Sequence, residues 1–146
     1  MSEEYAQLRL ENQLCFPLYA CSKEIIRLYK PHLEPLGLTY TQYIAMLVLW
    51  QRDGLTVKEL GKALWLDSGT LTPVLKSLEA KGYVIRKRSE ADERAVLISL
   101  TGAGQDLREK AAEVPFLVGQ CLNLSAEEAA ALHTLLYKIL NELKEE

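Results

Sequence analysis

Cys15 and Tyr19 are the residues of this sequence best suited to thiol chemistry. Four positions separate them, so a helix would place the phenol beside the thiol. A phenol that donates a hydrogen bond to sulfur stabilises the thiolate, which is the reactive form of cysteine. Because most buried cysteines are inert packing residues, the sequence leaves both roles open for Cys15.

The cysteines and histidines do not form the pattern of a metal or cofactor site. The three cysteines are an odd set, without the paired spacing of zinc ligands or of a disulfide framework. His32 and His133 are isolated in the sequence. We therefore predict no metal site and no cofactor.

A block of basic residues stands out in an acidic chain. Between residues 73 and 88, five cations face one acid, an excess of +4 in a chain of net charge −3, so the remaining residues must carry −7. Such a block is either an electrostatic footprint for nucleic acid or a solvated helix face. The cations are Lys76, Lys81, Arg86, Lys87 and Arg88.

Length and composition indicate a single folded domain. The 146 residues are 49% hydrophobic and 25% charged, which is ordinary for a globular protein. Residues 1–13 are polar and acidic, unlike a signal peptide, and the densest apolar run, residues 44–50, is too short to span a membrane. We expect a cytoplasmic protein without a membrane partner.

Helices are predicted over most of the chain. Apolar residues recur at spacings of three and four over residues 8–29, where Pro17 should kink the helix or delay its start, and Pro31 and Pro35 mark a connector. On this helix Cys21 would face away from the thiol six residues earlier, so we interpret it as a packing residue. Capping boxes predict three more helix starts, at Thr39 with Gln42, Thr56 with Glu59, and Ser125 with Glu128.

The segment over residues 64–100 predicts a helix followed by a hairpin. Gly82 should end the helix, and two β-prone runs, 83–88 and 95–100, flank a charged loop. The residue that caps the helix is one of Asp67, Ser68 and Thr70.

A further helix is predicted over about residues 102–120, capped by Thr101 and with a kink candidate at Pro115. The order of elements then contains a short helix, a second helix and a hairpin. This order predicts a mainly α fold with a small β wing, the winged helix-turn-helix.

Residues 55–101, LTVKELGKALWLDSGTLTPVLKSLEAKGYVIRKRSEADERAVLISLT, resemble the winged-helix core of MarR-type regulators. The most specific parts are the recognition helix DSGTLTPVLK and the wing, in which DER precedes a hydrophobic strand. Residues 10–25, LENQLCFPLYACSKEI, and 29–47, YKPHLEPLGLTYTQYIAML, resemble the branch that responds to organic hydroperoxides. The resemblance covers nearly the whole chain.

The resemblance implies a single MarR-type domain over residues 1–146 that forms a homodimer. Its first and last helices, at about residues 1–36 and 102–146, would interlock with those of the partner subunit. The winged-helix core, at about residues 38–100, would bind a palindromic operator in double-stranded DNA. The apolar residues of the last predicted helix exceed what a lone surface helix needs, which agrees with this dimer.

Within the implied DNA interface, small and hydroxylic residues of the recognition helix would approach the base edges. Lys76 can reach a phosphate or a guanine edge. Arg94, at the tip of the wing, would enter the minor groove, with Asp92 orienting it, and Arg86 would contact the DNA backbone. The small and hydroxylic residues are Ser68, Thr70 and Thr72.

The resemblance also implies a repressor that is released from DNA when an organic hydroperoxide oxidises Cys15. Tyr29 and Tyr40 would join Tyr19 near the thiol, contributed across the dimer interface. The sulfenic acid formed would condense with a small thiol, giving a mixed disulfide, or with another cysteine. Two roles are open for Cys121: a buried apolar residue, or the resolving cysteine of the partner subunit, displaced by about one turn from the position that the family uses.

Two other functions fit parts of the sequence. A MarR-type regulator that responds to another oxidant or to a phenolic ligand would have the same fold. A thiol peroxidase would use Cys15 catalytically, but the sequence has no thioredoxin-like motif and such an enzyme has no use for a wing. The sequence therefore predicts a regulator and not an enzyme.

Overall fold

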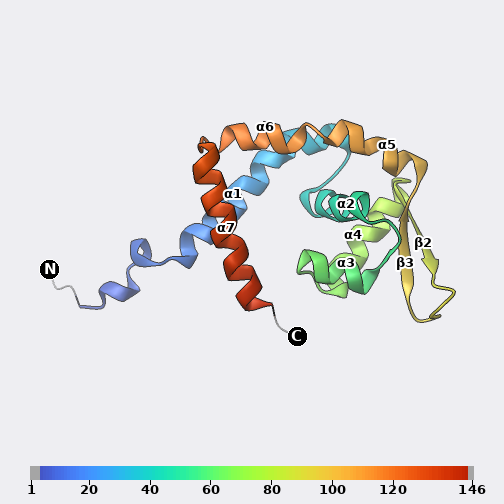
Figure 1. Cartoon of the computed structure of the whole chain (residues 1–146), viewed down its shortest axis with the longest axis horizontal. Coiled ribbons are helices and arrows are strands. Elements are labelled where there is room, and N and C mark those ends of the chain that lie inside the picture. The colour runs from blue at the N-terminus through green and yellow to red at the C-terminus, as the bar shows by residue number, and fades with distance from the viewer. Residues whose placement is uncertain (1–3, 145–146) are drawn as a thin grey trace. The chain divides into compact units, whose positions relative to one another are not determined.

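The computed structural model describes residues 4–144. It is mainly helical with one small antiparallel sheet, as predicted (Figure 1). The chain divides into two compact units, residues 1–114 and residues 115–146. Residues 1–3 and 145–146, the outer ends of the predicted dimerisation segments, lie outside the described residues. The elements are η1 (Ala6–Leu8), η2 (Leu10–Asn12), α1 (Cys15–Leu33), η3 (Glu34–Leu36), α2 (Tyr40–Gln51), β1 (Leu55–Thr56), α3 (Val57–Leu64), α4 (Ser68–Ala80), β2 (Val84–Arg88), β3 (Val96–Leu100), α5 (Gly102–Ala111), α6 (Val114–Cys121) and α7 (Ala126–Leu143).

The first long helix starts late, which is one of the two effects predicted for Pro17. Two short 3₁₀ turns, η1 and η2, occupy its expected start, and α1 begins at Cys15 instead of residue 8. Pro17 is then the third residue of α1, in the first turn, where backbone amides have no intrahelical partner. The helix also runs through Pro31 and ends at Leu33, so the predicted connector is shorter.

All three predicted capping boxes are present. In each, the hydroxyl of the first residue accepts the amide three positions on, and the longer side chain returns to the amide of the first. These boxes fix the starts of α2, α3 and α7. The hydroxyl–amide distances are 3.3 Å for Thr39 with Gln42, 3.1 Å for Thr56 with Glu59, and 3.1 Å for Ser125 with Glu128.

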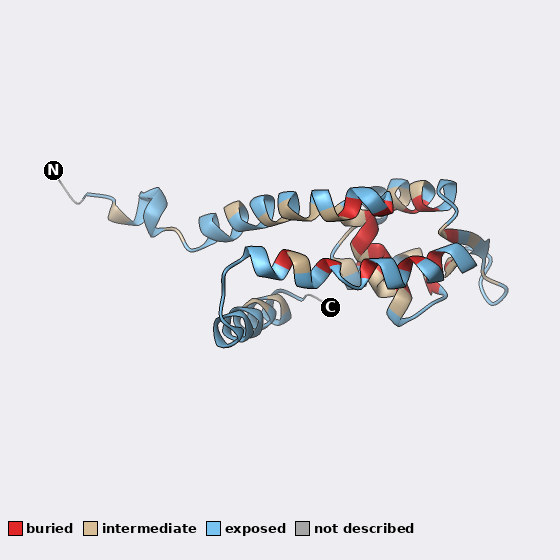
Figure 2. Ribbon diagram, turned by 90° about the horizontal axis from the view of Figure 1, so that it is seen from above, coloured by how far each residue is buried: buried red, intermediate tan, exposed pale blue. Residues whose placement is uncertain are grey.

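The core of residues 1–114 lies between α2, α4 and the sheet. One face of α4 is buried, and it packs against α2, α3 and β2. By contrast, α1 has one buried residue, Leu33, so only its C-terminal end joins this core (Figure 2). The largest fully buried side chains are Tyr43, Leu33, Met46, Leu49, Leu60, Leu71, Leu75, Leu78, Ile98 and Val84.

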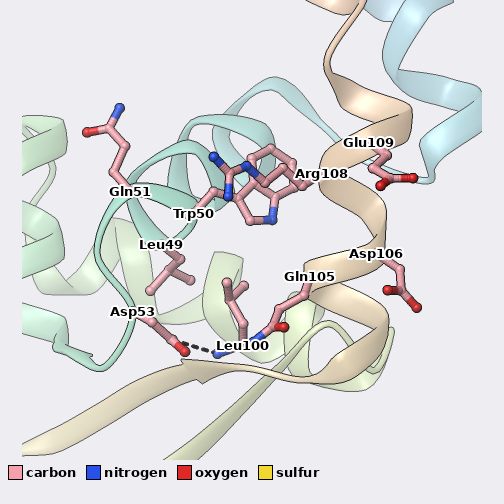
Figure 3. Close-up of a pocket in the computed structure, with 9 residues that line it drawn as sticks. All are labelled: Leu49, Trp50, Gln51, Asp53, Leu100, Gln105, Asp106, Arg108 and Glu109. Atoms are coloured by element: carbon pink, nitrogen blue, oxygen red, sulfur yellow. Dashed lines mark hydrogen bonds between the residues drawn. The ribbon is translucent and has the colours of Figure 1, made fainter.

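The predicted hairpin is present as β2 and β3, with Arg86 opposite Ile98. A third strand, β1, pairs with the other edge of β3 and was not predicted, because two residues are too few to show a periodic pattern. Asp53 supports this junction: one carboxylate oxygen accepts the amides of Gly54 and Leu100, each at 2.8 Å. Figure 3 shows the bond to Leu100.

The single helix predicted over residues 102–120 is two helices. α5 ends at Ala111 and α6 starts at Val114, which puts Pro115 in the first turn of α6, where its missing amide breaks no helical bond. In the unit formed by residues 115–146, α7 has no buried residue. Among residues 4–144, no helix has both the length and the apolarity of a membrane span.

Candidate DNA interface and thiol sensor

A tight turn joins α3 to α4. Trp65 ends α3 in the left-handed region, with φ of 58°, and the amide of Leu66 donates to the carbonyl of Gly61 at 2.9 Å. A Cβ atom at Gly61 would lie 2.6 Å from the Leu66 carbonyl oxygen, so only glycine allows this close approach. The two helices, α3 and α4, pack against each other and, with this turn between them, form a helix-turn-helix (Figure 1).

Of the three possible caps of α4, the structure selects Asp67. Its carboxylate accepts the backbone amide of Thr70 at 2.7 Å, and this bond, with others from Thr70 and Gly69, lowers the pKa of Asp67. The helix continues through Pro73, and Gly82 follows its end with φ of 82°, as predicted.

The residues predicted to contact bases lie near the start of α4. Ser68 and Thr70 are exposed, and Lys76 is exposed two turns further on. Thr72 is partly exposed, and its hydroxyl donates to the Ser68 carbonyl at 2.6 Å. The donor of Thr72 is therefore used inside the helix, and its methyl group and lone pairs remain for a ligand.

The wing tip is held by short-range hydrogen bonds. The amide of Ser89 donates to the carbonyl of Ala95 at 2.9 Å, and Arg88 donates to the carbonyl of Glu93 at 3.0 Å. Asp92 accepts the backbone amide of Arg94 at 3.0 Å, so the acid orients the backbone at Arg94 rather than its guanidinium. The side chain of Arg94 is exposed.

Arg86 differs from the other predicted DNA contacts. It lies opposite Ile98 and two positions from Val84, both buried, so it shares the inner face of the sheet. Its Nε atom is buried and has no hydrogen-bond partner among the described residues. Lys87 and Arg88 are the exposed cations of β2.

The predicted sensor cysteine is exposed. Cys15 is the first residue of α1, and Tyr19 follows one turn later with 61% of its surface exposed. The ammonium of Lys23 lies 5.2 Å from the centre of the Tyr19 ring. Cys15 and Tyr19 thus share one exposed side of α1, as their spacing predicts.

Tyr29 and Tyr40 meet in a cluster that also contains Tyr43. The centre of the Tyr29 ring lies 4.9 Å from the centre of the Tyr40 ring and 5.6 Å from the centre of the Tyr43 ring. Burial raises the pKa of all three phenols, and it raises that of Tyr43 to about 12, with repulsion from Tyr29 and Tyr40 as further causes. Tyr43 was not singled out in the sequence, although it lies one helical turn from Tyr40.

Within one chain the cluster is remote from the thiol. Cys15 and Tyr29 are fourteen residues apart on α1, which is a rise of about 21 Å along the helix. The structure therefore brings Tyr29 and Tyr40 to each other, but not to Cys15 of the same chain.

The other two cysteines, Cys21 and Cys121, are exposed in the single chain, so neither packs into the core of its own subunit. Cys21 lies on α1, where six residues from Cys15 give a rise of about 9 Å, more than the ~7 Å that a disulfide allows between Cα atoms. Cys121 ends α6, and its Sγ lies 3.5 Å from the carbonyl oxygen of Leu117.

No other feature of residues 4–144 suggests a catalytic or metal site. No group of three His, Cys, Asp or Glu side chains is placed to bind a metal in this part of the chain. A surface depression between α2 and α5 contains none of the predicted site residues (Figure 3). Trp50 lines it and donates its indole N–H to the carbonyl of Gly104 at 2.9 Å.

Comparison with known proteins identifies regulators. Residues 27–114 match the family model of the transcriptional regulator SarA/Rot. The organic hydroperoxide resistance transcriptional regulator of Bacillus subtilis (strain 168) is 50% identical over 143 residues, 98% of this chain and 97% of the relative. The HTH-type transcriptional regulator SarZ of Staphylococcus epidermidis is 46% identical, over 84% of this chain and 83% of its own length.

Solved structures agree with this comparison. Reduced AbfR bound to DNA has a TM-score of 0.79 at 37% identity, covering 97% of this chain and 98% of that chain. MarR from E. coli has a TM-score of 0.73 at 33% identity, covering 88% and 97%. The relatives from Bacillus subtilis and Staphylococcus epidermidis and the matching family model are named as transcriptional regulators, which are not enzymes. The chain therefore belongs to the MarR-type transcriptional regulators of the SarA/Rot family, in the branch of the organic hydroperoxide resistance regulators.

Proposed function

We propose that this chain is a cytoplasmic, homodimeric repressor that leaves its operator when an organic hydroperoxide oxidises Cys15. The observation that carries the proposal is an exposed thiol on a chain that also presents an exposed helix-turn-helix and wing. Relatives named as an organic hydroperoxide resistance regulator and as reduced, DNA-bound AbfR support it.

In the DNA complex, the start of α4 lies in the major groove of a palindromic operator. Ser68 and Thr70 approach the base edges, and Lys76 contacts a phosphate or a guanine. The Thr72 methyl group contacts a base, because its hydroxyl hydrogen is already bonded. Arg94 enters the minor groove from the wing. The Nε atom of Arg86 is buried, so only the end of this partly exposed side chain contacts the DNA backbone.

Dimer formation covers apolar side chains of the first and last helices. Large hydrophobic residues that are exposed in the chain are a signature of an interface when they gather on one element. The exposed members are Phe16, Leu18 and Ile26 on α1, and Leu132, Leu135, Tyr137, Ile139 and Leu143 on α7. These two sets of exposed apolar residues lie within the predicted dimerisation segments, at about residues 1–36 and 102–146.

The partner subunit completes the sensor. In one chain Tyr29 and Tyr40 lie far from Cys15, so the phenols that reach this thiol are those of the second chain. At the thiol they join Tyr19, which belongs to the same chain as Cys15. Phenol donors stabilise the thiolate, and their rings provide an apolar surface for an alkyl peroxide.

The sensing reaction is a two-electron oxidation of sulfur. The Cys15 thiolate attacks the terminal oxygen of the hydroperoxide and the O–O bond breaks. Sulfur keeps the OH group as a sulfenic acid, and the alkoxide takes a proton from water to become an alcohol. The sulfenic acid then condenses with a thiol and releases water. That thiol is a small cellular thiol, which gives a mixed disulfide, or Cys121 of the partner subunit.

One titration tests this function. Binding of the reduced protein to duplex DNA, selected from a random pool, is followed at several salt concentrations while cumene hydroperoxide is added. We expect salt-dependent binding that is lost after about one equivalent of peroxide per chain. Continuous peroxide consumption would indicate a thiol peroxidase. Release by hydrogen peroxide alone, or by a phenolic acid, would indicate a regulator of another signal.

A further inference from the structure

Gln42 is a buried polar side chain between the tyrosine cluster and the recognition helix, with 6% of its surface exposed. Its Oε1 atom accepts the amide of Thr39 at 3.1 Å and the ammonium of Lys81 at 2.8 Å, and its Nε2 atom donates to the hydroxyl of Ser77 at 2.9 Å. Gln42 therefore caps α2 and at the same time binds the C-terminal end of α4.

Two more hydrogen bonds join the same parts of the chain. The ammonium of Lys81 also donates to the carbonyl of Gly37, and the hydroxyl of Tyr83 donates to the carbonyl of Leu36 at 3.2 Å. The end of α4 and the residue before β2 are thus bound to the connector between α1 and α2. Lys81 belongs to the basic block and is exposed, but its ammonium group is bound to other groups of the same chain.

Gln42, which makes these hydrogen bonds, is the residue before Tyr43 of the tyrosine cluster. Tyr40 and Tyr43 flank Gln42 on the first turn of α2, and both rings contact Tyr29 of α1. A helical turn is stiff, so a displacement of Tyr40 or Tyr43 moves the Gln42 backbone as well. Apolar contacts between α2 and α4 tolerate sliding, whereas hydrogen bonds are directional and fix one arrangement.

We propose that the hydrogen bonds of Gln42 with Lys81 and Ser77 transmit the state of the tyrosine cluster to the recognition helix α4. The inference rests on the proposed function, since it requires a sensor that acts through those tyrosines. Gln42 and Lys81 are positioning residues, which contact neither the thiol nor DNA. Their loss uncouples sensing from release while Cys15 is still oxidised.

The test separates oxidation from its effect on DNA. Cumene hydroperoxide is used with a small thiol, and two quantities are measured: the rate of Cys15 modification, by mass spectrometry, and the ratio of the DNA dissociation constants of oxidised and reduced protein. We expect Gln42→Leu and Lys81→Met to modify Cys15 at the wild-type rate, and to reduce the ratio at least about fivefold. Gln42→Glu keeps the acceptor for Lys81, and its second carboxylate oxygen can accept a hydrogen bond from the Ser77 hydroxyl in place of the lost donor, so this variant should retain the wild-type ratio.

Gln51→Leu makes the same chemical change at an exposed site on α2 and is the matched control. Lys81 is exposed, so Lys81→Met should fold even if Gln42→Leu does not. Weaker binding by an equal factor in both redox states, with the ratio unchanged, would assign the network a purely structural role and overturn the proposal. A wild-type protein whose affinity does not respond to oxidation would contradict the proposed function itself, and the link with it.

Discussion

The carboxylate of Asp92 accepts the backbone amide of Arg94 at 3.0 Å, and the Arg94 side chain is left exposed at the tip of the wing. The acid thus fixes where the arginine leaves the turn, without forming an ion pair that DNA would have to break. In the proposed complex, less backbone entropy would then be lost when the arginine binds in a groove.

Arg94→Ala should weaken operator binding by roughly 1–3 kcal/mol, because it removes a minor-groove contact. Gel-shift titration at physiological salt measures the effect, and sedimentation checks that the dimer is intact. Arg108→Ala, which removes an exposed arginine of α5, is the control and should bind as the wild type does. Unchanged affinity of Arg94→Ala would show that the wing does not contact DNA.

Lys76→Ala should reduce the dependence of binding on salt. If Lys76 neutralises a phosphate, its loss lowers the slope of log Kd against log salt by about one. Lys110→Ala removes an exposed lysine from α5 and should leave the slope unchanged. An unchanged slope together with relaxed sequence preference would instead assign Lys76 to a base.

If Cys121 is the resolving cysteine, protein oxidised without a small thiol should run as a disulfide-linked dimer on non-reducing gels. Cys121 is exposed in the single chain, so its own subunit leaves the thiol free to react with a sulfenic acid. The dimer band should vanish in Cys15→Ser and in Cys121→Ser, and persist in Cys21→Ser. Monomer only, with a thiol adduct on Cys15 by mass spectrometry, would reject the resolving role of Cys121.

The fold should lose stability at high pH, when the phenols of the tyrosine cluster lose their protons. The pKa of Tyr43 is raised to about 12, above the value near 10 of an unfolded chain, so the folded state holds this proton more tightly. The resulting stability is fully present below pH 10 and is lost as pH rises towards 12. Denaturant unfolding across this interval should show a smaller decline in Tyr43→Phe than in the wild type, and equal declines would contradict the assigned pKa.

Local signals in the sequence predicted most of the fold. The capping boxes at Thr39, Thr56 and Ser125 are complete within four residues, so no tertiary information was needed to find them. The late start of α1 was one of two outcomes predicted from Pro17, whereas the break between α5 and α6 was missed, because Pro115 is compatible both with a kinked helix and with a first turn.

The placement of the candidate site residues was predictable where they lie at exposed positions of a single element. Cys15 with Tyr19, and Asp92 with Arg94, are near neighbours in the chain. The second role of Gln42 was not predictable, since its partners Ser77 and Lys81 are 35 and 39 residues away. Only the packing of α2 against α4 brings these groups together.

The claim that Cys15 is the peroxide sensor is tested most directly by measuring whether the Cys15→Ser protein releases DNA. Fluorescence anisotropy of a labelled operator is recorded for wild type and Cys15→Ser, each reduced and then treated with cumene hydroperoxide and a small thiol. We predict that both reduced proteins bind equally and that only the wild type dissociates, because serine cannot form a sulfenic acid. Dissociation of Cys15→Ser on peroxide treatment, to the same extent as the wild type, would place the sensor elsewhere and contradict the assignment of Cys15.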